Sequence, residues 1–226
     1  AGKYLRHPDM ENGEFHSFKP ICGLYWATHN RGYAECAPIE ELYEDLEEQG
    51  LWGMNCFQIW FSMAEHKIED SADFIDRLKK LMKFVKSLGI KTSMIGLGNE
   101  AFDDSPMELR ADWTPDHDGY VRRLNAHYHR EICPSKPGGI EKILEYRRQV
   151  LEAFKDAEVD FLSLVPYDQG GCTCSECAPW GGNGYLKCVK ALIPAIKELR
   201  PTAKIYINTW YFGKFREKGD VSEFDL

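Results

Sequence analysis

The sequence predicts an α/β protein with a parallel sheet, and specifically a (β/α)8 TIM-type barrel of which about five β/α units are present in this chain. Apolar runs alternate with amphipathic helical stretches in the order β-α-β-α-β-α-β-α-β, and neighbouring parallel strands need such helical crossovers. No GxGxxG sequence follows the first strand, as it would in a dinucleotide-binding open sheet. Polar and aromatic residues follow every strand in turn, which suits a barrel because it gathers all its strand ends around one mouth.

The five predicted strands are short, mostly apolar runs, each followed by a polar or glycine-containing segment. The first is apolar enough to be buried on both faces. The strands cover residues 20–28, 54–61, 91–97, 160–166 and 204–210.

The four predicted helices carry apolar residues that recur with the helical period on one face. Pro38 stands in the first turn of the first helix, where proline is tolerated, and Gly50 and Gly89 end the first two helices. Pro194 predicts a kink in the last one. The helices cover residues 38–50, 71–88, 140–154 and 185–199.

The chain is predicted to be a single barrel domain over residues 1–226, truncated at its C-terminal end, with a long polar insertion at 101–139 after the third strand. A complete barrel has eight units and typically about 250 residues, which is more than these strands and helices supply. The first and fifth strands would then be open edges prone to pairing. We expect a missing barrel segment or a partner surface to cover them.

The charge balance excludes one class of partner. Lys and Arg number 28 against 36 Asp and Glu, a net charge of −8 without a basic cluster, so we expect no nucleic-acid partner. The apolar runs end well short of the roughly 20 residues that a membrane span needs, so we expect a soluble chain with no membrane partner. The compartment stays open, since an export signal for a periplasmic or secreted location could have been removed before Ala1.

The strongest chemical signal lies at residues 161–182, FLSLVPYDQGGCTCSECAPWGG. A buried strand leads there into a polar loop rich in glycine and cysteine, which is where α/β proteins place their chemistry. Asp168 follows the strand as a candidate acid. Cys172, Cys174 and Cys177 are candidate metal ligands, because they are too tightly spaced to bridge one another as disulfides.

Three motifs, CPS at 133–135, PYDQGGCTCSEC at 166–177 and PWG at 179–181, resemble a bacterial glycoside-hydrolase-like (β/α) barrel group and, more distantly, the family 20 β-hexosaminidases. The resemblance covers most of the predicted barrel and implies a protein that acts on glycans. In the hexosaminidases the fourth strand ends in an Asp-Glu pair, in which the Asp orients the substrate's 2-acetamido nucleophile and the Glu is the general acid. This chain has Asp168 followed by Gln169, and an amide cannot supply a proton at neutral pH.

Several interpretations of this departure stay open. Asp168 is itself the acid, with its pKa raised by burial among aromatic rings and with Glu100 completing a carboxylate pair. Alternatively, the barrel binds glycans without cleaving them, or Gln169 replaces a natural Glu. A metal-dependent hydrolase that uses His127 and His129 is the remaining class. We predict a glycosidase acting on O-glycosyl bonds with Asp168 and Glu100 as catalytic residues, against the structural alternative in which both bond nearby backbone amides.

Aromatic and amide side chains at the strand ends suit a glycan substrate. The apolar C–H face of a pyranose packs on an aromatic ring while its hydroxyl groups bond polar side chains, although the same rings also serve in ordinary barrel packing. The predicted substrate-binding residues are Trp26, Asn30, Trp60, Asn99, Tyr167, Gln169, Trp180, Asn208 and Trp210.

The cysteines predict one structural Zn²⁺ bound by Cys133, Cys172, Cys174 and Cys177. The CxCxxC sequence supplies three thiolates, and Cys133 supplies the fourth because it ends the insertion, whose loop neighbours the CxCxxC loop in a barrel. A closed four-sulfur site has no open position for water, which makes it a scaffold for the active loop. The alternative is a disulfide, for instance between Cys133 and one of the three, if the protein is exported to an oxidising compartment, and Cys36 is a weaker candidate for either role.

Overall fold

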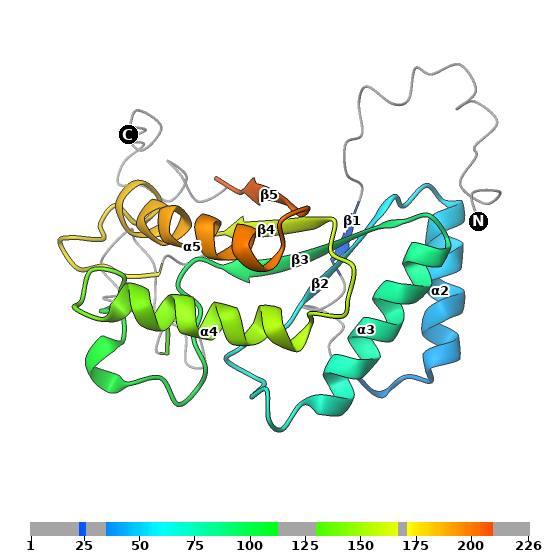
Figure 1. Cartoon of the computed structure of the whole chain (residues 1–226), viewed down its shortest axis with the longest axis horizontal. Helices are drawn as coiled ribbons and strands as arrows, with labels where there is room; N and C mark the ends of the chain where they lie inside the picture. The colour runs from blue at the N-terminus through cyan, green and yellow to red at the C-terminus, as the bar shows by residue number, and fades with distance from the viewer. Residues whose placement is uncertain (1–22, 26–34, 113–129, 167–170, 210–226) are drawn as a thin grey trace, which may run out of the picture.

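The described part of the chain forms one parallel sheet whose five strands follow each other in chain order (Figure 1). The computed structural model describes residues 23–25, 35–112, 130–166 and 171–209. The predicted parallel α/β organisation is confirmed. The elements are β1 (Gly23–Tyr25), α2 (Ile39–Leu51), β2 (Cys56–Trp60), α3 (Ala72–Ser87), β3 (Lys91–Leu97), η3 (Met107–Leu109), α4 (Gly139–Ala153), β4 (Phe161–Val165), η6 (Trp180–Tyr185), α5 (Leu186–Leu199) and β5 (Lys204–Ile207).

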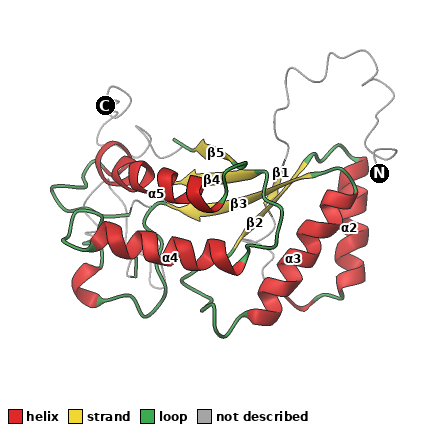
Figure 2. Ribbon diagram, in the orientation of Figure 1, coloured by secondary structure: helices red, strands yellow, loops and turns green. Residues whose placement is uncertain are grey.

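The two faces of the sheet differ in what covers them. The helices are packed beside the strands of the sheet (Figure 2). Successive strand residues point to opposite faces, so Leu162 and Leu164 of β4 join the large core that includes residues of the helices. Val165 instead joins Ile95 and Leu97 in a small cluster on the opposite face. The order of the described strands has no reversal of the kind that marks a doubly wound sheet. The sheet therefore has the organisation of successive β/α units, and closure into a barrel stays a prediction.

The apolar stripes predicted from the sequence supply the helical side of the core. Fully burying one such side chain stabilises the fold by about 1.5–3 kcal/mol, so these stripes fix the helices on the sheet. None of the helices in the described ranges is long and apolar enough to cross a membrane. The buried stripe residues include Leu42 and Leu46 of α2, Leu78, Leu81 and Val85 of α3, Ile143, Val150 and Leu151 of α4, and Val189, Leu192 and Ile196 of α5.

Asp160 stabilises the end of the sheet at which β3 and β4 begin. Its carboxylate accepts hydrogen bonds from the Thr92 backbone N–H at 2.9 Å, from Lys86 Nζ at 2.9 Å and from Lys91 Nζ at 3.3 Å. Burial raises the pKa of Asp160, but the N–H of Thr92 and the two lysines outweigh it and hold that pKa below its usual value. The ionised form of Asp160 is therefore the one that stabilises the fold.

Most element boundaries lie within one or two residues of the sequence-based expectation, and two differences bear on the site. β5 ends at Ile207, so Asn208 lies just beyond the strand. The last helix is preceded by the π-helical segment η6, and α5 then continues through Pro194 to Leu199. A π-helix has no apolar period of its own in so short a stretch, so the pattern of residues did not predict it. Most of the predicted first strand lies outside the described residues.

Candidate metal centre and the neighbouring strand ends

Four cysteines from two distant segments meet in one cluster. The Sγ atoms of Cys133, Cys172, Cys174 and Cys177 all lie within 4.8 Å of one another. Cys133 Sγ is 3.8 Å from both Cys174 Sγ and Cys177 Sγ, and all four are free thiols. The structure thus brings together the four residues that the sequence predicted as ligands, while the exposed Cys36 is not among them.

The spacing of the sulfurs fits a tetrahedral ion. Four sulfurs about 2.3 Å from a central Zn²⁺ would form a tetrahedron with edges of about 3.8 Å, which is the separation seen between Cys133 and two of its neighbours. Three of the cysteines are buried and Cys174 is half-buried. The cluster therefore suits a closed metal site of the structural type.

The segment at 109–112 braces both cysteine loops through backbone hydrogen bonds. The Cys133 N–H donates to Leu109 O at 2.9 Å, and the Thr173 N–H donates to Asp112 O at 2.6 Å. The first of these anchors the loop before α4, and the second anchors the loop after β4. The beginning of the long connection after β3 is thus a part of the scaffold that holds the ligands.

Asn99 ties the same two loops to the end of β3. Its Nδ2 donates to Ile132 O at 3.1 Å and to Gly171 O at 3.0 Å. These two carbonyls immediately precede Cys133 and Cys172 in the chain. The Asn99 side chain is 0% exposed, so in this structure its amide holds the ligand loops and has no surface to offer to a sugar.

The thiols of the cluster affect one another's pKa values through hydrogen bonds. Cys172 and Cys177 hydrogen-bond Cys133, and these contacts, helped by the backbone N–H groups of Ser135 and Lys136, hold the pKa of Cys133 well below its usual range. The same contact with Cys133 raises the pKa of Cys172 and raises that of Cys177 to about 12. Because cysteines bind a metal in their deprotonated form, a cation that binds here would displace protons from the thiols.

Trp180, a predicted sugar-binding residue, lies in the core behind the cysteine loop. It is 1% exposed, and its ring packs between Gly171 and Gly184. A Cβ placed on either glycine would approach the ring to 2.2 Å, so both positions require glycine. The expectation that Trp180 lines a sugar site disagrees with this burial, because stacking on a sugar needs an exposed face.

Glu100 is enclosed by hydrogen-bond donors at the end of β3. Its Oε1 accepts from Trp60 Nε1 at 3.0 Å and from the Met63 N–H at 3.1 Å. Its Oε2 accepts from Arg147 Nη2 at 3.0 Å and from the Leu97 N–H at 3.4 Å. The residue is 3% exposed, so this carboxylate fits an anchoring role better than exchange of protons with a substrate.

Arg147 was not predicted as a functional residue, although it stands in the apolar stripe of α4. Its guanidinium donates to Glu100 and, at 3.0 Å, to Leu97 O. A Cβ on Gly96 would lie 2.6 Å from that guanidinium, so β3 carries a glycine where the arginine passes. An arginine among the apolar residues of a helix was the signal in the sequence, since buried arginines are almost always paired.

The other predicted site residues divide into two groups. Trp60 is half-buried at the end of β2, and Asn208 is exposed after β5 with its backbone N–H bonded to Leu164 O at 2.8 Å. The remaining predictions fall outside the described residues. They are Trp26, Asn30, Tyr167, Asp168, Gln169 and Trp210 for the sugar site and His127 and His129 for the alternative metal site.

Comparison with models of protein families finds no match, and comparison with curated proteins finds none. Among solved structures, the α-galactosidase from Lactobacillus brevis matches 83% of this chain at 13% identity with a TM-score of 0.50. GH5_18 from Streptomyces cattleya in complex with GlcNAc matches 83% at 11% identity with a TM-score of 0.51. The chain spans 26% and 43% of the length of these two structures. Its fold is therefore similar to that of glycoside hydrolases.

Proposed function

We propose that this chain belongs to a glycoside-hydrolase-like, carbohydrate-active protein whose acid is Asp168, in a (β/α)8 barrel completed by further strands. The observation that carries the proposal is the half-buried indole of Trp60, held by its hydrogen bond to Glu100. The ring packs on the small cluster of Ile95, Leu97 and Val165, on the face opposite the helices. In a closed barrel this face is the interior, and a fixed indole at its mouth suits the apolar face of a pyranose.

The carboxylates of Asp168 and Glu100 have different roles in this proposal. Asp168 follows Val165 of β4 by three residues in the sequence, and Val165 pairs with Leu97 at the end of β3. Glu100 pairs with Arg147 and positions the Trp60 ring. In this proposal Asp168 protonates the leaving glycosidic oxygen. This revises the pair expected from the sequence, in which both residues were catalytic.

Turnover of aryl glycosides tests the assignment. The array includes aryl α-galactosides and aryl N-acetylglucosaminides, and the variants are Asp168→Asn and the control Asp156→Asn. Asp156 has a side chain 75% exposed and lies between α4 and β4, at the opposite end of the strands. We expect Asp168→Asn to lower kcat about 100-fold or more, as for loss of a general acid, and Asp156→Asn to leave it unchanged. Equal activity of both variants would remove Asp168 from the mechanism.

A non-catalytic glycan-binding protein is the second candidate function. It is favoured by one observation, namely that the strand-end carboxylate in the described region, Glu100, is already engaged by four donors. In that case glycan binding, measured by calorimetry, persists in Asp168→Asn and no glycoside is turned over. Loss of binding in Trp60→Ala in either case would support the proposed sugar platform.

We also propose that the four-cysteine cluster binds one Zn²⁺, which acts as a scaffold for the Asp168 loop. Tetrahedral four-sulfur sites suit zinc or iron, and a closed site without water suits a structural ion. Elemental analysis of protein purified without added metal is expected to give about one zinc per chain, with all thiols titratable after denaturation without reductant. Cys177→Ser should lose the metal, whereas Cys188→Ser, at an equally buried cysteine outside the cluster, should keep it. Absence of metal together with fewer titratable thiols would support a disulfide instead.

A further inference from the structure

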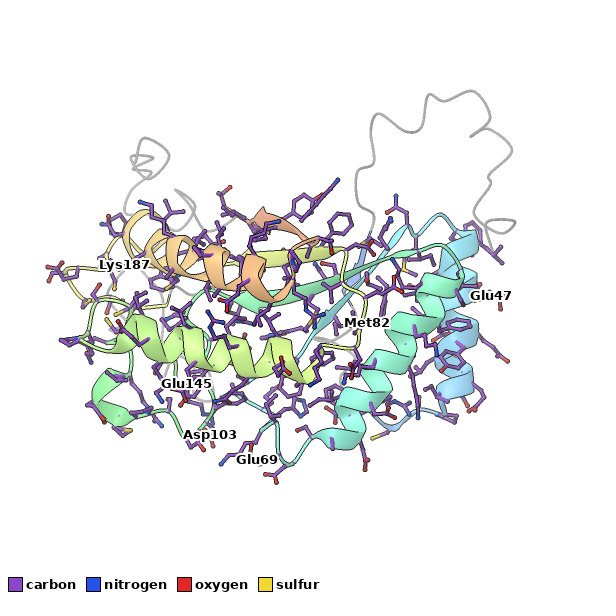
Figure 3. The ribbon with its side chains drawn as sticks, viewed as in Figure 1. Glu47, Glu69, Met82, Asp103, Glu145 and Lys187 are labelled. Carbon is purple, nitrogen blue, oxygen red and sulfur yellow. The ribbon has the colours of Figure 1, made fainter. Side chains whose placement is uncertain are left out.

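We propose that Lys187 and Ser135 form a hydrogen-bonded relay that supplies positive charge to the cysteine cluster through Cys177. The proposal rests on the metal site proposed above. Lys187 Nζ donates to Ser135 Oγ at 2.7 Å, and Ser135 Oγ lies 3.2 Å from Cys177 Sγ. Lys187 lies in the first turn of α5, at the end of the molecule away from α2 and α3 (Figure 3).

The direction of the hydrogen bonds follows from the donors available. A lysine ammonium can only donate, so Ser135 Oγ accepts from Lys187. The single hydroxyl proton of Ser135 is then available to Cys177, whose sulfur accepts it best as a thiolate. The relay therefore places a hydrogen-bond donor, backed by a positive charge, beside the sulfur of Cys177.

The cluster needs such compensation because of its charge. A divalent ion held by four thiolates leaves two negative charges in excess, and three of the four cysteines are buried, where uncompensated charge is costly. Hydrogen-bond donors around the ligands spread this charge and stabilise the complex. The charged group of Lys187 is linked to a ligand through one hydroxyl.

The other lysine beside the cluster, Lys136, directs its charge elsewhere. Its Nζ donates to Arg110 O at 2.7 Å and pairs with Asp112 at 3.1 Å. Its contribution to the cluster is its backbone N–H, which with that of Ser135 bonds to Cys133. Ser135 thus serves both ligand loops, with its N–H directed to Cys133 and its hydroxyl to Cys177.

The rate of metal release measures the relay. Full-length, metal-loaded protein is mixed with a chromogenic chelator, and the variants Ser135→Ala and Lys187→Met are compared with wild type. Loss of a partner outside the first ligand shell typically weakens metal binding about 10–100-fold, so we expect release to be faster by about 10-fold or more. Methionine keeps most of the apolar stem of lysine, which separates loss of charge from loss of packing.

Two controls match the two variants. Ser175→Ala removes an exposed hydroxyl between Cys174 and Cys177 in the sequence. Lys190→Met removes an exposed lysine of α5, three residues after Lys187. Both should release the metal within about twofold of wild type, since neither group belongs to the relay. Ser135→Thr and Lys187→Arg, which retain the hydroxyl and the charge, should also remain slow.

The double variant Ser135→Ala/Lys187→Met should release the metal no faster than Ser135→Ala, because Lys187 acts only through that hydroxyl. As a second readout, the charge-transfer band from sulfur to Co²⁺ in cobalt-substituted protein should shift in the relay variants and not in the controls. Wild-type release rates in both single variants, or additive effects in the double variant, would overturn the relay while leaving the metal site in place. Wild-type protein that binds no Zn²⁺ or Co²⁺ would overturn both.

Discussion

The buried ion pair between Glu100 and Arg147 gives a quantitative test of how β2, β3 and α4 are held together. The charged atoms are 3.0 Å apart, and the side chains are only 2% and 5% exposed. Their gross attraction is about 5–6 kcal/mol at an effective dielectric constant of about 20, and much of it offsets the cost of removing both charges from water. Removing one partner leaves the other charge buried and unpaired, which costs about 3–5 kcal/mol.

The structure distinguishes the two single substitutions within that range. In Arg147→Met, Glu100 still accepts from Trp60 and from the N–H groups of Met63 and Leu97, so we expect a loss of about 3 kcal/mol. In Glu100→Gln, Arg147 retains its bond to Leu97 O. The side-chain N–H₂ of the new glutamine, however, faces neighbouring groups that can only donate hydrogen bonds. The expected loss is therefore nearer about 5 kcal/mol, within a total stability of about 5–15 kcal/mol.

The assay is urea unfolding followed by circular dichroism, with the double variant Glu100→Gln/Arg147→Met closing the cycle. We expect the double variant to lose at least about 2 kcal/mol less than the sum of the single losses, because it leaves no unpaired charge. The matched control is the exposed pair of Glu152 and Lys155 at 2.9 Å, where the same substitutions should change stability by less than about 0.5 kcal/mol. A loss below about 1 kcal/mol in both single variants, or additivity in the cycle, would refute the reasoning.

Two further predictions concern Asp160, at the start of β4, and Gly171, in the cysteine loop. The pKa of Asp160 is lowered on folding, so the stability that its carboxylate contributes is present above its unfolded pKa of about 3.9 and is lost as pH falls toward the folded value. Asp160→Asn should therefore cost about 1.5–3 kcal/mol at pH 7 and weaken the fall in stability at acidic pH, as measured by urea titrations from pH 7 to pH 3. A fall at acidic pH equal to that of wild type would contradict this. Gly171→Ala should cost about 1–3 kcal/mol and lower the metal content, because its Cβ would meet the Trp180 ring at 2.2 Å beside Cys172. Wild-type thermal stability together with full metal content would contradict this.

The helices and strands could be predicted because apolar residues recur along them with a regular spacing or form short runs. β3 was predicted at 91–97, as observed, since a short segment that ends in apolar residues lies between Gly89 and the polar Asn99 and Glu100. The convergence of Cys133 with the CxCxxC loop was predictable from the topology, because loops that follow neighbouring parallel strands lie side by side.

The roles of individual side chains at the strand ends were harder to predict, because they depend on depth within the fold. Trp180 and Asn99 have the residue types of a sugar site, yet one packs between two glycines and the other bonds two backbone carbonyls. Glu100 looked like a catalytic carboxylate because its partner, Arg147, is 47 residues away in sequence. A pattern of residue types along the chain carries no information on which polar group is already satisfied by a distant one.

Asn99 and Glu100 are adjacent at the end of β3, and they serve different parts of the molecule. Asn99 bonds the loops that carry the cysteines, whereas Glu100 bonds β2 and α4. The cysteine loops contain little regular structure, so we expect their order to depend on the proposed metal site and on Asn99, while β3 is paired with both β2 and β4. Chelation of the metal should therefore raise amide hydrogen exchange at 130–138 and 171–185 and leave 91–97 protected. Equal loss of protection in β3 would mean that the ion stabilises the whole fold, and no change in either loop would mean that the ion is not part of the scaffold.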